Sequence, residues 1–360
     1  MSPALLLGML HAVVDAATVT VVFRVTGAVP LTAVVAWVLA YDVLAFGLQP
    51  LIGWVQDRWA SPRTGMVAGV GLTAASVGCA HGVDAGTPAV VLAVVLAGMG
   101  NAAFHLGAGA CVLRGDMHHA TPAGLFVGPG ALGLGLGVWY GGTPSAGPLW
   151  LVLLPVLLAL PVVVRTEVPD PTAAVAGIPR PAREACIGAM GLLLLSIAIR
   201  ALVGGTAGRG YSGTWLLLGI PVVAFAGKVL GGVLADRYGW TRTSVTALVL
   251  SAPLLALTWP HPIVLLAGML VFQLTMPVTL VAVVRLVPTR IATGFGLTCL
   301  ALVLGALGPT TVWGYHLGHR PLLAGWVLLA AVAVWAGLTL AGVPGKASVD
   351  RAPAPTVTRR

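Results

Sequence analysis

The sequence predicts an all-α membrane protein with twelve transmembrane helices in two pseudo-symmetric six-helix bundles. Apolar residues make up 58% of the 360 residues and charged residues only 8%, whereas a soluble domain carries about 25% charged residues. Apolar runs of about 20 residues, long enough to cross a bilayer as a helix, recur along the chain. One polar loop pattern occurs once in each half, which indicates an internal duplication.

Six of the expected spans lie in the first half, and polar residues, prolines or glycines bound each one. Span one has no basic segment before it and carries His11 and Asp15, so we expect a permanent helix rather than a cleaved signal peptide. Span two starts after Pro30 and span three after the first polar loop, while span four ends at Arg114 and span six at Arg165. Span five is spaced by glycines. In order, these spans are residues 4–25, 31–55, 65–82, 88–113, 121–141 and 147–164.

The second half repeats this order at an offset of about 170 to 180 residues. Span eight runs into the second polar loop, and span ten ends at Arg285 as span four ends at Arg114. Span eleven is spaced by glycines like span five. The spans of this half are residues 184–204, 213–235, 243–259, 262–286, 292–314 and 321–342.

A proline-rich polar stretch divides the chain near its middle. We expect residues 1–164 to form the N-terminal bundle, residues 165–184 a cytoplasmic linker, residues 185–342 the C-terminal bundle and residues 343–360 a disordered cytoplasmic tail. With twelve spans, most loop Lys and Arg residues fall on the side of both termini. The positive-inside rule therefore predicts cytoplasmic termini and a plasma (inner) membrane location.

Charge and cysteine usage exclude other classes of protein. The net charge of +9 is spread over loops and forms no basic stripe, so nucleic acid is not an expected partner. The four cysteines lie singly in apolar segments, which indicates neither a disulfide framework nor a zinc site. No cofactor is expected. Hydrolase motifs such as Gly-x-Ser-x-Gly and His-Glu-x-x-His do not occur, so we expect no enzyme.

The two polar loops share the pattern Gly-x-x-x-Asp-Arg followed by a further Arg. The aspartates would cap or approach a neighbouring helix terminus, and the arginines would hold lipid phosphates or carboxylates of the other bundle. Such contacts clamp one conformation and must break in the other. The residues of these loops are Gly53, Asp57, Arg58 and Arg63 in the first half, and Gly232, Asp236, Arg237 and Arg242 in the second.

These loops resemble the signature of the major facilitator superfamily, and the resemblance covers essentially the whole chain. Three further strings are similar to the fosmidomycin-resistance-type exporters of that superfamily. The resemblance implies a central cavity lined mainly by spans one, four, seven and ten, and alternating access by rocking of the halves. The strings are Gly8-x-x-His11-x-x-x-Asp15, Gly100-Asn101-Ala102-Ala103-Phe104-His105, and the glycine-rich run from Gly128 to Gly137.

Ionisable residues inside spans are the main candidates for function, because each costs about 2.5 to 3.5 kcal/mol on insertion scales. His11 and Asp15 are four residues apart and share one helix face. His105 lies roughly 13 Å inward from Arg114 along a helix. If spans one and four face the cavity, these groups converge there and can exchange a proton. A purely structural pairing is the alternative, and a zinc or copper site of the same groups would lack a compact ligand motif.

A second set of candidates comes from spans two, four, eight and ten. Lys228 lies roughly 12 Å from the loop end of span eight, too deep for an easy snorkel, and would face protein or water. Its counterpart by position is Gln49. A buried ammonium suits an anionic substrate, although a fixed pair with an aspartate is the alternative. Asn101 and Gln273 are expected to line the same cavity.

Asp42 and Arg200 form a hypothetical outer gate. They lie in the outer halves of spans two and seven, which meet at the external mouth in the inward-open state that the resemblance implies. A rim salt bridge without a gating role is the alternative, and its energy could be near zero. For the glycines of spans five and eleven we expect sliding faces, with plain helix packing as the alternative.

The sequence therefore predicts a secondary active transporter that moves a small organic, anionic or zwitterionic solute by proton-coupled efflux. Its partners would be this small-molecule substrate, protons and membrane lipid, and it would act as a monomer. The alternative is an uptake symporter or facilitator for a small anion or metal complex on the same fold.

Overall fold

The computed structural model describes residues 2–27, 30–81, 88–143, 147–208, 214–256, 261–310 and 320–343. All regular secondary structure in these ranges is helical. The elements of the first half are α1 (Pro3–Thr26), α2 (Leu31–Asp42), the π-helix η1 (Val43–Gly47), α3 (Gln49–Trp59), α4 (Pro62–Ala80), α5 (Pro88–Gly115), α6 (Thr121–Gly142) and α7 (Trp150–Arg165).

The remaining elements follow a short connecting segment. They are α8 (Thr172–Val175), α9 (Arg183–Ala207), α10 (Thr214–Tyr238), α11 (Trp240–Ala256), α12 (Pro262–Gln273), α13 (Met276–Leu286), α14 (Ile291–Leu307), the 3₁₀ helix η2 (Gly308–Thr310) and α16 (Arg320–Leu340). The helix α8 lies inside the predicted linker. Beyond Val343, the predicted tail lies outside the described residues.

Each of the expected spans overlaps a helix or a chain of helices, and residues 82, 213, 257–259 and 311–314 of these spans lie outside the described residues. Span two is α2, η1 and α3 in sequence, and span ten is α12 and α13. Within the described ranges, eight helical segments are long and apolar enough to cross a membrane, and two shorter apolar helices lie at Trp150–Arg165 and Ile291–Leu307. The total of twelve crossings and the domain boundaries remain predictions.

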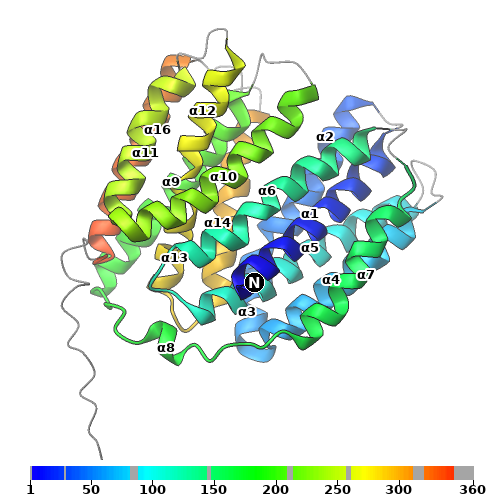
Figure 1. Ribbon diagram of the computed structural model, residues 1–360, viewed down its shortest axis with the longest axis horizontal. Coiled ribbons are helices and arrows are strands. Elements are labelled where there is room, and N and C mark those ends of the chain that lie inside the picture. Colours follow the sequence, from blue (N-terminus) through cyan, green and yellow to red (C-terminus); the bar gives the residue numbers. More distant parts are fainter. Residues whose placement is uncertain are drawn as a thin grey trace, which may run out of the picture.

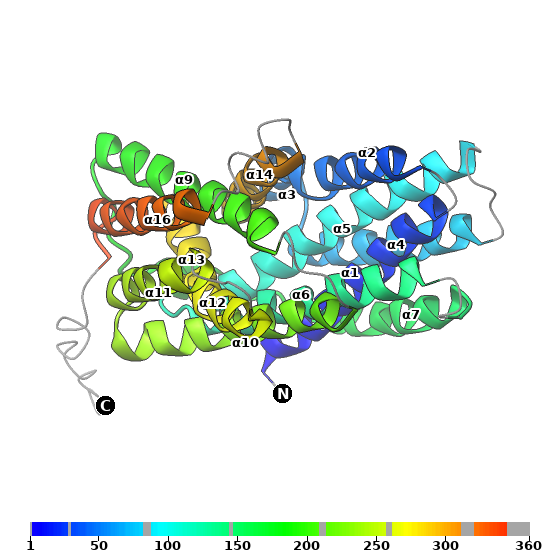
Figure 2. The same cartoon turned by 90° about the horizontal axis from the view of Figure 1, so that it is seen from above.

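The helices of the two halves lie side by side. Figure 1 shows the first half, coloured from blue to green, on the right and the yellow and orange helices of the second half on the left. The two most extensive contacts between them are made by α3 with α14 and by α6 with α10. Seen from above in Figure 2, these pairs lie at opposite edges of the seam between the halves. The helix α2 instead packs on α1, η1 and α5 of its own half.

Glycines on two faces of α6 allow close approaches between helices. On one face, an added Cβ at Gly133 would lie 2.8 Å from the Cα of Ala12 in α1. On another, an added Cβ at Gly124 would lie 2.6 Å from the carbonyl oxygen of Lys228 in α10. Small residues permit this approach, which gives transmembrane helices their van der Waals contact. One face of α6 therefore builds its own half and another joins the two halves.

Candidate functional site

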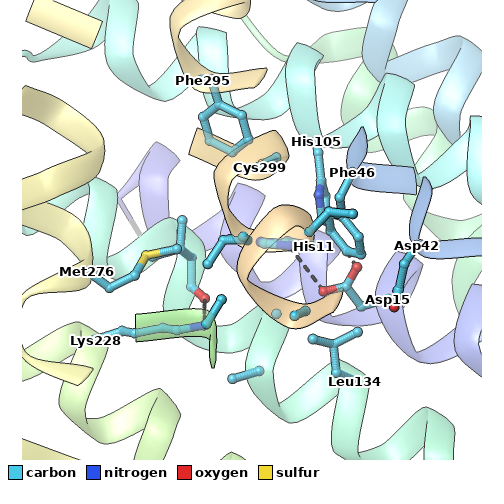
Figure 3. Close-up of a pocket in the computed structure, with 17 residues that line it drawn as sticks. His11, Asp15, Asp42, Phe46, His105, Leu134, Lys228, Met276, Phe295 and Cys299 are labelled. Carbon is cyan, nitrogen blue, oxygen red and sulfur yellow. Dashed lines mark hydrogen bonds and ion pairs between the residues drawn. The ribbon is translucent and has the colours of Figure 1, made fainter. Parts of the chain in front are cut away.

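A cavity of about 290 Å³ lies between the two halves, and most of its wall is apolar. Figure 3 shows the labelled side chains around it. The helix α1 contributes two of its polar groups, α2 and α5 one each, and α10 one. The charged or titratable side chains of aspartate, histidine and lysine in the wall are His11, Asp15, Asp42, His105 and Lys228.

Asp15 lies near the middle of α1 and is only 1% exposed. Asn101 of α5 donates a hydrogen bond to its Oδ1 at 2.7 Å. The Nε2 of His105 lies 3.0 Å from the same oxygen, and the Nε2 of His11 lies 3.1 Å from Oδ2. Both carboxylate oxygens are thus in contact with nitrogen groups, as buried charges require. The structure therefore brings together the predicted proton-site residues of α1 and α5.

The second ring nitrogen of each histidine also has a partner. The Nδ1 of His11 lies 3.0 Å from the carbonyl oxygen of Phe126 in α6. The Nδ1 of His105 lies 3.3 Å from the Nε2 of Gln49, which donates a 2.7 Å hydrogen bond to the carbonyl of Ala45. Ala45 belongs to η1, and π-helical turns are frequently found at functional sites. The triad of His11, Asp15 and His105 is therefore held by α1, the second span, α5 and α6.

The same triad contains three donor groups that could hold a metal ion. Ligand atoms of His11, Asp15 and His105 all lie within 4.8 Å of one another. They are in direct contact with each other at 3.0 and 3.1 Å, so we interpret the triad as a hydrogen-bonded cluster. The expectation that it serves no metal remains a prediction.

Lys228 reaches the cavity from α10 without a carboxylate partner. Its Nζ lies 3.5 Å from the carbonyl oxygen of Val127. Figure 3 shows Lys228 on the side of the cavity away from Asp15 and Asp42. Ion pairs among the described residues join only histidines to Asp15 and Asp116. The alternative of a fixed pair between Lys228 and an aspartate is therefore wrong for this structure.

The hypothetical gate pair is not formed here. Asp42 lines the cavity, but Arg200 is only 5% exposed and lies inside the second half. Its Nη1 donates to Thr279 at 3.2 Å, and its guanidinium lies 5.8 Å from the ring centre of Phe272. Among the described residues Arg200 forms no ion pair with Asp42 in this conformation, because its guanidinium contacts Thr279 and Phe272 of its own half instead. Pairing in another conformation stays a hypothesis.

The three amide side chains that we expected in the cavity wall lie elsewhere. Asn101 and Gln49 are fully buried behind the triad rather than in the cavity wall. Gln273 is the last residue of α12, and its Cβ lies close to Gly227 of α10. The prediction that all three line the cavity is wrong for the volume described here, because two of them hold the histidine and aspartate side chains from behind.

The two Gly-x-x-x-Asp-Arg loops make matching contacts between the halves. Asp57 accepts hydrogen bonds from the backbone N–H groups of Ala292 and Thr293 at 3.0 and 2.8 Å. Asp236 accepts them from Ala120 and Thr121 at 2.7 and 2.8 Å. Each aspartate thereby caps the N-terminus of a helix in the other half, α14 or α6. Negative charge at a helix N-terminus is stabilising, as the sequence predicted.

The glycines of the loops allow this contact, and the arginines lie around it. An added Cβ at Gly53 would lie 2.6 Å from the carbonyl oxygen of Ala292, and one at Gly232 would lie 2.7 Å from that of Ala120. The predicted arginine contacts to carboxylates of the other half are not among the described ion pairs. Arg63 instead donates to the carbonyl oxygen of Thr166, and Arg58 and Arg237 lie over Trp59 and Tyr238; no contact is described for Arg242.

Sequence reasoning missed the apolar and small residues of the site. Gly130 faces the contact between His11 and Asp15, and only its place in the glycine-rich fifth span hinted at this role. Cys299 lines the cavity although its sequence context indicated plain packing. The other missed wall residues include Phe46, Leu134, Met276 and Phe295, which are indistinguishable by sequence from lipid-facing residues.

Comparisons with known proteins give the fold. No family model and no curated protein matches the sequence. The structure of the transporter FucP in its outward conformation is similar, with a TM-score of 0.67, 12% identity and coverage of 95% of this chain and 98% of that one. The human organic anion transporter MFSD10 gives a TM-score of 0.69, 16% identity and coverage of 93% and 99%.

A bacterial homologue of the iron transporter ferroportin, in an outward-facing state, is also similar. Its TM-score is 0.62 at 14% identity, and the match covers 95% of this chain and 98% of that one. At these identities the likeness concerns the fold. The chain is a multi-pass membrane protein with the fold of major facilitator superfamily transporters.

Proposed function

We propose that this protein is a secondary active transporter, not an enzyme, which moves a small organic anion or zwitterion by alternating access and proton-coupled efflux. The main observation behind this proposal is a cavity with a hydrogen-bonded Asp–His triad on one side. On the other side lies Lys228, which has no carboxylate partner among the described residues. The termini would be cytoplasmic, the membrane the bacterial plasma membrane, and the functional unit a monomer.

Lys228 supports an anionic group on the substrate. The one carboxylate of the triad already contacts three nitrogen groups, so Lys228 is a positive charge that the triad does not compensate. A charge in the membrane interior calls for a partner. The largely apolar wall also favours a substrate with an apolar body over a polyhydroxylated one. Among the similar structures, MFSD10 is described as an organic anion transporter.

Asp42 supports the zwitterionic form of the substrate. It is the second carboxyl or amino group of the wall that lies outside the triad, and it accepts no side-chain hydrogen bond from the residues that the structure describes. A substrate carrying an amino or hydroxyl group near its anionic group could satisfy Lys228 and Asp42 together.

The aspartate caps support the alternating-access step. In this conformation the halves are closed against each other where Asp57 caps α14 and Asp236 caps α6. Opening that end requires breaking both contacts, and their matched geometry suits a rocking motion of one half against the other.

Proton–anion symport is a second candidate, favoured by the placement of Lys228 and the triad on one cavity. An anion and a proton bound in the same cavity attract each other, which favours carrying both in one direction. FucP is described as a fucose:proton symporter. The direction of the proton gradient that drives accumulation distinguishes symport from efflux by antiport.

The test begins with purified protein and a panel of aromatic and aliphatic carboxylates, phosphonates and amino acids, which are screened for thermal stabilisation. A binding compound is then loaded into proteoliposomes with an imposed pH gradient. We expect gradient-driven accumulation, and its loss in Asp15→Asn with Asp116→Asn, a loop aspartate, as the matched control. Undiminished gradient-driven transport in Asp15→Asn would remove the proton site from the triad.

A further inference from the structure

The hydrogen-bond directions around His11 fix where its protons lie. The carbonyl oxygen of Phe126 can only accept, so the Nδ1 of His11, 3.0 Å away, carries a proton. The Nε2 of the same ring lies 3.1 Å from the Oδ2 of Asp15. Without a proton between them, two lone pairs would face each other. A proton therefore lies on this contact, shared between the imidazole and the carboxyl group.

His105 has the opposite arrangement. The carbonyl oxygen of Ala45 can only accept, so it fixes the amide nitrogen of Gln49 beside the Nδ1 of His105. That Nδ1 must accept, which leaves the ring proton on Nε2 to be donated to Asp15 at 3.0 Å. The neutral ring satisfies every contact. A second proton on Nδ1 would face an N–H group of Gln49 and is excluded by this arrangement.

The contact between His11 and Asp15 is open to the cavity. Both residues and Gly130 line it, whereas Gln49 and Asn101 lie behind. An added Cβ at Gly130 would lie 2.6 Å from the Nε2 of His11 and 2.9 Å from the Oδ2 of Asp15. Glycine is thus the residue that leaves room for this contact, and for water or substrate to reach its proton.

From these observations we infer that the transported proton is held between His11 and Asp15, and that His105 is a positioning residue that does not titrate. This inference rests on the proposed proton coupling and assigns the proton within the triad. Removing the proton leaves two acceptors 3.1 Å apart within α1, so deprotonation must move the His11 ring, whose Nδ1 also bonds Phe126 of α6. The titratable or charged groups facing it from the packed helices are Tyr41, Asp42, His105, Lys228 and Cys299.

Nitrogen-15 NMR of the full chain in lipid nanodiscs, with labelled histidine, tests the inference without a substrate. The signals are assigned with His11→Gln and His105→Gln. As the pH is raised, we expect the Nε2 of His11 to change from a protonated to a bare nitrogen, while its Nδ1 stays protonated. His105 should keep one protonated and one bare nitrogen throughout. In Asp15→Asn the change at His11 should be lost.

Two glycine variants separate this role from simple packing. Gly130→Ala should disturb the His11 signals, whereas Gly71→Ala, where an added Cβ meets nothing within 4 Å, should leave them unchanged. The inference would be overturned if His105 gained a second proton while the protonation of His11 stayed constant. It would also be overturned if neither histidine changed protonation with pH. A different result would contradict the proposed function: wild-type protein in proteoliposomes that moves no protons with a transported anion.

Discussion

At the scale of single residues, the polar groups of the cavity differ in how far the protein itself satisfies them. Asp15 contacts three nitrogen groups, whereas the Nζ of Lys228 has, within the described part of the chain, only the carbonyl of Val127 at 3.5 Å as a hydrogen-bond partner. An unsatisfied polar group that faces a cavity calls for an explanation, such as a ligand, water or ion that binds there. In the proposed function, this asymmetry corresponds to a proton site in the first half and an anion site in the second.

Lys228→Met should weaken the binding of an anionic compound by about 10- to 100-fold, because a hydrogen bond to a charged group contributes about 1.5 to 3 kcal/mol. Isothermal titration calorimetry with a compound from the stabilisation screen measures the loss. Arg180→Gln in the connecting segment is the matched control for the lost positive charge. Equal affinities of Lys228→Met and wild type would show that the anion binds elsewhere.

The sequence predicted these residues only as far as depth and spacing allow. His11 and Asp15 are four residues apart, and His105 lies at a similar depth in span four, so their convergence followed once both spans faced the cavity. Depth does not fix the direction of a side chain, however. Arg200 illustrates the limit, because it lies at the predicted height but packs on Phe272 and Thr279 inside its own half.

At the scale of the elements, two helices receive their N-terminal caps from the other half of the chain. Neither α14 nor α6 has a capping side chain at its own N-cap residue, Arg290 or Ala120. Asp57 and Asp236 supply the acceptors instead. Opening this end of the molecule therefore leaves the first N–H groups of both helices without these partners. The caps make the stability of each helix end depend on the conformation of the whole protein.

Asp57→Ala should speed amide exchange at residues 292–295 by about 2- to 30-fold, because loss of an N-cap costs about 0.5 to 2 kcal/mol. Hydrogen exchange with mass spectrometry in nanodiscs measures this change. The reciprocal variant Asp236→Ala serves as the control, and its larger effect should fall on residues 120–123. An unchanged exchange rate at 292–295 in Asp57→Ala would contradict the capping role.

Hydropathy predicted the helices but not their irregularities. The expected span 31–55 consists of α2, η1 and α3. Nothing in its apolar sequence predicted the π-helical turn that places Phe46 in the cavity wall. Span ten divides after Gln273, where Pro277 was the only hint of a break. Apolar periodicity is weak when lipid and protein interior are equally apolar, so the faces of the helices could not be predicted.

At the scale of the whole molecule, the duplicated loops make two equivalent contacts between the halves. Both glycines sit against the backbone of the other half, and both aspartates cap a helix there. The duplication, read from the spacing of these loops alone, places the two contacts at equivalent positions of the seam between the halves. A single methyl group at either glycine would therefore work against closure of this end.

Gly53→Ala should shift the protein toward the conformation that is open at the end where Asp57 and Asp236 lie. The added Cβ would be 2.6 Å from the carbonyl oxygen of Ala292, and overpacking of this kind costs about 1 to 3 kcal/mol. If the cost falls on the closed conformation, the ratio of the two conformations changes by about 5- to 100-fold. Cys299, a native residue of the cavity wall, can report which side is open.

A membrane-impermeant maleimide, applied to sealed vesicles of either orientation, should modify Cys299 several-fold faster in Gly53→Ala than in wild type from the side of the polar loops. From the opposite side the modification should be slower. Mass spectrometry of the peptide that contains Cys299 separates it from the other three cysteines. Gly71→Ala, with nothing within 4 Å of an added Cβ, controls for the extra methyl group. Faster modification from both sides would indicate a loosened bundle, and an unchanged ratio would show that contact at Gly53 does not set which end is open.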